Sequence, residues 1–128
     1  MQTKQRRAFA TVAVIVLLAA VRTSAHHGQS AYDMTKSVTV TGTVTEFQFV
    51  NPHCILVFDV KDDKGAIERW QGELTSPNRL LRAGWTAQSV KPGDRIVLTG
   101  SRAKSGAPSL YITKAVVNGQ EFKTAPSH

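Results

Sequence analysis

The sequence predicts an all-β fold with one short helix, and three observations lead to this conclusion. Residues 38–60 read as two strands that are broken at Asn51-Pro52-His53. A third strand precedes one capped helix, and two more strands follow that helix. This order, strand-strand-strand-helix-strand-strand, matches a five-stranded OB-like Greek-key barrel, with an open β-sandwich as the alternative.

The first strand supports the barrel because its inward side changes along its length. Val40 and Val44 occupy even positions and alternate with threonines, whereas Phe47 and Phe49 occupy odd positions. A change of face within one strand requires a bulge or a strong bend, which Gly42 allows. We therefore expect this strand to bend at a corner of the barrel.

The second and third strands form a predicted hairpin. The run at 54–60 is almost continuously apolar, and the polar turn at 61–65 closes on a glycine. The third strand covers about 66–74 and carries polar residues on both faces. This polarity predicts that the third strand is partly exposed on both sides.

The helix is predicted from its end signals. Ser76 can accept a backbone N–H as the N-cap, and Pro77 suits the first helical position. Gly84 can take the left-handed position after the helix, which would let Trp85 pack back on Leu80.

The last third of the chain reads as strands and tight turns. The turn at 90–94 contains Pro and Gly in the order of a type II turn and leads into a strand at 95–101. Another strand covers 110–117, and Asn118-Gly119 is a type I′ hairpin signal before a short extra strand at 120–122.

The N-terminus predicts export. Three basic residues precede an uncharged apolar run at 8–21, and small residues lead to a cleavage site after Ala25. We expect residues 1–25 to be a signal peptide, with an uncleaved anchor as the alternative, and the protein to be periplasmic or secreted. No stable membrane span is expected after processing, because the run is shorter than the roughly 20 residues that a helix needs.

The remaining 103 residues divide into an extended arm at 26–37, the barrel at 38–122 and a tail at 123–128. Four of the 16 basic residues lie in the signal, which leaves 12 against nine acidic residues and a net charge of +3. So small and dispersed a charge does not indicate nucleic-acid binding. Cys54 is the only cysteine. It excludes an internal disulfide, and its apolar strand predicts a buried side chain.

A combination of motifs resembles a family of small exported bacterial proteins that is classed as a domain of unknown function. The resemblance spans nearly all of 26–122 and implies an exported bacterial protein, but it implies no activity, substrate or cofactor. The motifs that carry it are His26-His27, Asn51-Pro52-His53, Ser76-Pro77-Asn78, Leu80-Leu81, Gly84-Trp85 and Lys91-Pro92-Gly93-Asp94.

Three histidines, His26, His27 and His53, form a candidate metal site. Imidazole binds copper, zinc and nickel, and the affinity of divalent ions peaks at copper. If cleavage follows Ala25, the new amine and the ring of His26 can chelate one ion. Asn51 or Asp33 could orient a ligating ring. The alternative is that the pair is solvated and that His53 only ends a strand.

The barrel face is a second candidate site. OB-type barrels bind polymers across the second and third strands, and Phe47, Phe49, Trp70 and Tyr111 are the aromatic candidates. A polysaccharide, a peptide or an envelope protein would be the partner, since export makes nucleic acid an improbable one. The alternative is that Phe47, Phe49 and Trp70 complete the core.

No residue pattern predicts catalysis. The sequence has no nucleophile elbow and no glycine-rich phosphate loop. Asp62 and Asp63 lie at a hairpin tip, where solvated turn chemistry accounts for them. We therefore expect a binding protein rather than an enzyme.

Overall fold

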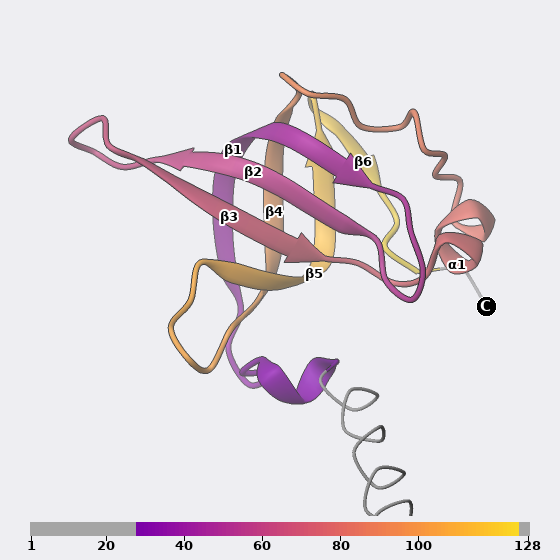
Figure 1. Cartoon of the computed structure of the whole chain (residues 1–128), viewed down its shortest axis with the longest axis horizontal. Coiled ribbons are helices and arrows are strands. Elements are labelled where there is room, and N and C mark those ends of the chain that lie inside the picture. Colours follow the sequence, from indigo (N-terminus) through magenta and orange to yellow (C-terminus); the bar gives the residue numbers. More distant parts are fainter. Residues whose placement is uncertain (1–27, 126–128) are drawn as a thin grey trace, which may run out of the picture. The chain divides into compact units, whose positions relative to one another are not determined.

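The computed structural model describes residues 28–125, which contain a mostly β fold with one short α-helix (Figure 1). Of these residues, 28–30 belong to the first of two compact units into which the chain divides, and 31–125 belong to the second. The elements in chain order are the 3-10 turn η2 (Gln29–Ala31), β1 (Val38–Gln48), β2 (Ile55–Lys61), β3 (Ile67–Glu73), α1 (Pro77–Arg82), β4 (Arg95–Arg102), β5 (Ser109–Val117) and β6 (Gln120–Phe122).

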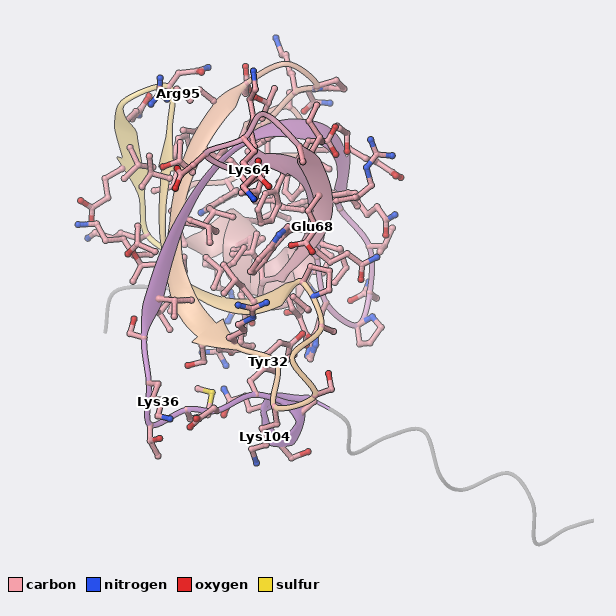
Figure 2. The ribbon with its side chains drawn as sticks, turned by 90° about the vertical axis from the view of Figure 1, so that its left-hand side faces the viewer. Tyr32, Lys36, Lys64, Glu68, Arg95 and Lys104 are labelled. Atoms are coloured by element: carbon pink, nitrogen blue, oxygen red, sulfur yellow. The ribbon has the colours of Figure 1, made fainter. Side chains whose placement is uncertain are left out.

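Five of the strands close into a barrel. The sheet order is β3-β2-β1-β4-β5-β6, and an additional parallel pairing joins β3 to β5. This pairing matches Gln71 with Ser109 and Glu73 with Tyr111. Viewed along the barrel, the strands follow one another around a ring (Figure 2). The closure and the helix between β3 and β4 confirm the OB-like barrel, and the open sandwich is wrong because the sheet joins its own edge.

The bend predicted in the first strand is present. The pairing of β1 with β2 shifts register between Val44 and Glu46, so one extra residue sits in β1. Gly42 is needed just before this point. A Cβ there would lie 2.7 Å from the Asp59 carbonyl oxygen and 2.9 Å from the Phe58 ring, so the neighbouring strand occupies the space that a side chain would need.

Strands β2 and β3 form the predicted hairpin, whose tip projects beyond the other strands in Figure 1. Trp70, Gly72 and Leu74 are buried on the inner side, whereas the residues from Ile67 to Arg69 are exposed. The expected exposure of both faces therefore holds for the outer half of β3, and the inner half is buried on one face.

Helix α1 ends as its sequence predicts but does not begin so. Gly84 has a φ of 95°. The Gly84 N–H donates to the Leu81 carbonyl at 3.1 Å, and the Trp85 N–H donates to the Leu80 carbonyl at 2.9 Å. These two bonds form a Schellman motif. The side-chain cap expected from Ser76 is wrong, because Ser76 provides only its backbone carbonyl, which accepts from Arg79 and Leu80.

The predicted turns in the last third of the chain also form. Gly93 has a φ of 92°, and Asn118 and Gly119 both have positive φ, as a type I′ hairpin requires. Asn118 adds two side-chain bonds, since its Oδ1 accepts from the Arg95 N–H and its Nδ2 donates to Asp94. The extra strand is present as β6 and pairs with β5.

The core fills the inside of the barrel and extends under α1. Trp85 is fully buried, and its ring packs at a tilt against Phe122, with 4.9 Å between the ring centroids. Its Nε1 donates to the Lys123 carbonyl at 2.7 Å. The buried cluster contains Val44, Cys54, Leu56, Phe58, Trp70, Leu74, Leu80, Trp85, Val90, Ile96, Leu98, Leu110, Ile112, Ala115 and Val117. Among residues 28–125, no helix is both long and apolar enough to cross a membrane.

The arm before β1 is not extended throughout, because η2 and a bridge at Tyr32 interrupt it. Tyr32 forms an isolated antiparallel bridge with Ala103, in the loop between β4 and β5. The Asp33 N–H donates to the Arg102 carbonyl at 2.9 Å, and the Lys104 N–H donates to the Ala31 carbonyl at 3.0 Å. Residues 31–33, called the strap below, are therefore held against this loop by the backbone.

Candidate functional site

His53 lies in the turn between β1 and β2, next to the end of β3. The turn contains a cis peptide bond between Asn51 and Pro52. Beyond His53, Cys54 bonds to the two residues that follow β3: its N–H donates to the Thr75 carbonyl at 3.0 Å, and its carbonyl accepts from the Leu74 N–H at 2.9 Å. These bonds extend the β2–β3 ladder and place His53 beside the last residues of β3.

The partner of His53 is Glu73, whose Oε1 is hydrogen-bonded to Nδ1 of the imidazole. A carboxylate can only accept hydrogen bonds, so the hydrogen lies on Nδ1. In the neutral ring, Nε2 then carries a lone pair. The His53 side chain is 42% exposed, whereas that of Glu73 is 16% exposed. The ring is therefore anchored through one nitrogen on a shielded carboxylate, and part of the His53 side chain remains exposed.

The second oxygen of Glu73 has a partner from the strap. The Tyr32 hydroxyl donates to Glu73 Oε2 at 3.0 Å and lies 3.2 Å from Ser109 Oγ. Because the phenol has one hydrogen and gives it to Glu73, the Ser109 hydroxyl donates to Tyr32. Burial raises the pKa of the Tyr32 phenol, although the bond from Ser109 acts in the opposite direction. The four side chains form one connected chain: Ser109, Tyr32, Glu73 and His53.

Two of the sequence-predicted metal ligands, His26 and His27, lie outside the described residues. Asn51 is exposed in the turn. Asp33 accepts from the Thr35 hydroxyl at 2.6 Å and from its N–H at 3.1 Å, and these bonds lower the pKa of the Asp33 carboxyl. Glu73 is the residue that holds the ring of His53 in this structure, and orientation of a ligating ring by Asn51 or Asp33 stays a prediction. Within residues 28–125, no group of three or more His, Cys, Asp or Glu side chains could hold an ion.

The four aromatic candidates do not gather on one open face. Trp70 is 6% exposed, and the Arg102 guanidinium lies 4.9 Å from the centre of one of its rings. Phe47 and Phe49 are partly buried and pack against the core. Tyr111 is half-buried, 5.8 Å from the Tyr32 ring.

Cys54 is fully buried, as its place in an apolar strand predicts. Burial raises the pKa of the Cys54 thiol. A backbone hydrogen bond from Val50 lowers it, but by less than burial raises it. A buried thiol of this kind is a poor nucleophile and a poor metal ligand, because both roles need the thiolate. The thiol next to His53 therefore packs in the core and does not add to the polar chain.

Sequence reasoning missed Glu73, Tyr32 and Ser109. Glu73 could have been found from the hairpin register: β2 and β3 pair Ile55 with Glu73, which places His53 diagonally across from Glu73. Tyr32 and Ser109 carried no such local signal. Tyr32 reaches Glu73 because the strap docks on the barrel, and Ser109 reaches Tyr32 because β5 closes against β3.

Together, the fold and the site define a small OB-like barrel that carries a histidine–carboxylate–tyrosine chain at its β3–β5 closure. The family described as "Family of unknown function (DUF6152)" matches residues 13–110, and the chain belongs to this family.

Comparison with curated proteins gave no match. Among solved structures, a chain in the crystal structure of yeast Stn1 and Ten1 is similar, with 17% sequence identity and a TM-score of 0.42. The match covers 63% of this chain and 42% of that chain.

Proposed function

We propose that this protein is an exported binding protein that takes up a transition metal ion, copper above all, through Nε2 of His53. The observation that carries the proposal is the hydrogen bond between Nδ1 of His53 and Glu73. Histidines that bind metals almost always donate their other ring N–H to a carboxylate, a carbonyl or water. Such a bond fixes the tautomer and makes the free nitrogen more basic, and this is the arrangement around His53.

His26 and His27 are the further donors that the sequence offers. Cleavage after Ala25 would give His26 a free amine, and this amine and a ring nitrogen can chelate one ion. Imidazole and amine donors favour Cu(II) over other divalent ions of the first transition series. Export supports this choice, since the apolar run at 8–21 and the small residues before Ala25 are typical of a signal peptide.

Isothermal titration of Cu(II) into the processed chain, beginning at His26, tests the proposal. We expect one ion per chain with a Kd below about 10 µM. His53→Ala and His26→Ala should each weaken binding at least about tenfold, which corresponds to about 1.4 kcal/mol. His128→Ala is the matched control, because it removes an imidazole from the tail. Binding weaker than this limit, or equal affinity in the His53→Ala and His128→Ala variants, would count against the proposal.

A second candidate function is a metal-free adaptor that binds a peptide or protein of the envelope. The observation that favours it is the outer half of β3. Strand β3 pairs with β5 only from Gln71 to Glu73, so residues 67–70 have β2 on one side and no described strand on the other. Ile67, on this stretch, is 67% exposed. An extended peptide could add to such an edge.

The test compares Ile67→Lys with Ile67→Val in capture of envelope proteins by the immobilised chain. A charge on an edge strand opposes strand addition, whereas valine keeps the apolar surface. We expect Ile67→Lys alone to lose the captured partner. Equal capture by both variants would argue against this function.

A further inference from the structure

The strap and His53 are connected through a single hydroxyl. Tyr32 is 8% exposed, and backbone bonds on both sides of it hold the strap against the β4–β5 loop. Figure 2 shows Tyr32 between the N-terminal segment that carries it and the barrel, on the same side as Lys104. The aromatic ring supplies the apolar contact, with Tyr111 at 5.8 Å. The strap is therefore held by two kinds of contact from Tyr32: the packing of its ring and the hydrogen bond of its hydroxyl.

The hydroxyl decides how Glu73 is held. Glu73 Oε2 accepts from Tyr32 at 3.0 Å, and Glu73 Oε1 accepts from Nδ1 of His53. With both oxygens engaged, the carboxylate has a fixed orientation. Without the phenol, Oε2 would lose this partner in a shielded place, and the carboxylate could turn toward another donor or toward water. The orientation of Oε1 toward His53 would then be less well defined.

We propose that Tyr32 is a positioning residue for His53. It holds Glu73 so that the imidazole keeps its hydrogen on Nδ1 and presents Nε2, and it thereby couples docking of the strap to binding at His53. This inference deepens the proposed function and rests on it for the ion, although the effect on the tautomer does not require a metal. By thermodynamic linkage, an ion on Nε2 must favour the docked strap as much as the docked strap favours the ion.

A purely structural role for Tyr32 would give different results. In that case the phenol would only satisfy its own hydrogen-bonding needs, and its loss would lower stability without changing the state of His53. Tyr32→Phe separates these possibilities because it keeps the ring and removes the hydroxyl. Tyr111→Phe is the matched control, since it makes the same chemical change on the ring that lies 5.8 Å from the Tyr32 ring and keeps the Tyr32 hydroxyl.

The first experiment needs no metal. Long-range proton–nitrogen NMR of the imidazole reports which nitrogen of His53 carries the hydrogen. At a pH where the ring is neutral, we expect the Nδ1–H form to dominate in the wild type and in Tyr111→Phe. The population should move toward the Nε2–H form in Tyr32→Phe and further in Glu73→Gln. An unchanged tautomer ratio in Tyr32→Phe would overturn the positioning role.

The second experiment measures the coupling with Cu(II) as the probe. We expect Tyr32→Phe to weaken Cu(II) binding about tenfold, at the lower end of the range for residues that orient a ligand, and Tyr111→Phe to leave the affinity unchanged. In the wild type, Cu(II) should slow hydrogen exchange of the Asp33 and Lys104 amides, and this effect should shrink in Tyr32→Phe.

The outcomes distinguish the two proposals. If the wild type binds no Cu(II), the proposed function fails, and the tautomer ratio still judges the positioning role. If the wild type binds Cu(II) and Tyr32→Phe binds it with equal affinity, the coupling fails and the metal site stands. The positioning role also requires that His53→Ala and the His53→Ala/Tyr32→Phe double variant lose the same amount of Cu(II) affinity, because Tyr32 acts only through His53.

Discussion

The two halves of strand β3 differ in what surrounds them, although the same strand β2 pairs with both. In the outer half, Arg69 pairs with Asp59 across the hairpin through two bonds, at 2.9 and 3.2 Å. In the inner half, Glu73 pairs with His53 and accepts a further bond from Tyr32. The Arg69 side chain is 63% exposed, and that of Glu73 is 16% exposed.

The difference shows how a contact between neighbouring strands can fix the orientation of a side chain. The outer pair satisfies its own charges in solvent, where such pairs contribute little to stability. The inner pair lies where β5 closes against β3, which shields the carboxylate and brings a third group to it. Closure of the barrel thus distinguishes the inner pair, in which the imidazole is held through Nδ1 by a carboxylate that has a further partner.

The largest effect should come from filling the closure itself. Gly72 lies beside Glu73, and a Cβ on it would lie 2.5 Å from Ile112 Cδ1 and 3.0 Å from Ile112 Cγ1. We expect Gly72→Val to lower the free energy of unfolding by about 3 kcal/mol, because the buried Ile112 side chain must leave its place in the core. Gln71→Val, at an exposed position of the same strand, is the control and should change it little. Chemical denaturation measures both, and equal stabilities would contradict the close packing of β3 on β5.

The next effect concerns the two carboxylates of the hairpin. Glu73→Gln should weaken Cu(II) binding by about tenfold or more, since an amide oxygen is a weaker acceptor for the Nδ1–H of His53. Asp59→Asn makes the same chemical change in the outer pair and should leave Cu(II) affinity unchanged. Titration of both variants under one set of conditions is the measurement. Equal losses would mean that general charge, rather than orientation of His53, controls binding.

The smallest effect is the pH dependence of the outer pair. The hydrogen bonds from Arg69 lower the pKa of the Asp59 carboxyl below its ordinary value of 3.8. The folded state therefore binds this proton less readily than the unfolded chain does. The resulting stabilisation is present above the ordinary pKa and is lost as pH falls through the lowered folded value.

Asp59→Asn should accordingly be slightly less stable to heat than the wild type near neutral pH. The difference should disappear in acid, and about 1 M salt should reduce it at any pH. Thermal unfolding followed by circular dichroism provides the measurement. A difference that persists below the pKa range of the carboxyl would show that the substitution acts through packing instead of charge.

Several local features could be predicted because neighbouring residues determine them. Gly84 and Asn118-Gly119 take the positive φ angles that their turns require, and those angles depend on the residue type at each position. The bulge near Val44 followed from a change of face within a single strand. The N-cap at Ser76 was predicted in the same way and failed, since its side chain makes no capping bond.

The orienting residues of the candidate site could not be predicted with the same success. Glu73 lies 20 residues from His53, Tyr32 lies 41 from Glu73, and Ser109 lies 77 from Tyr32. Asn51 and Asp33 were expected to orient a ligating ring, and the structure instead shows Glu73 hydrogen-bonded to the ring of His53. Proximity along the chain was a poor guide here, since the strand register and the docking of the strap decide which side chains meet.

By itself, the sequence determined the order of strands and helix, the tight turns and the bend in β1. These follow from side-chain periodicity and from the φ angles that glycine, asparagine and proline adopt, and both act over a few residues. Only the tertiary structure decided that β5 closes on β3, that the strap docks at Ala103, and that Glu73 therefore lies between Tyr32 and His53. The reason is that these contacts join segments far apart in the chain, and they form only when the whole barrel packs around one core.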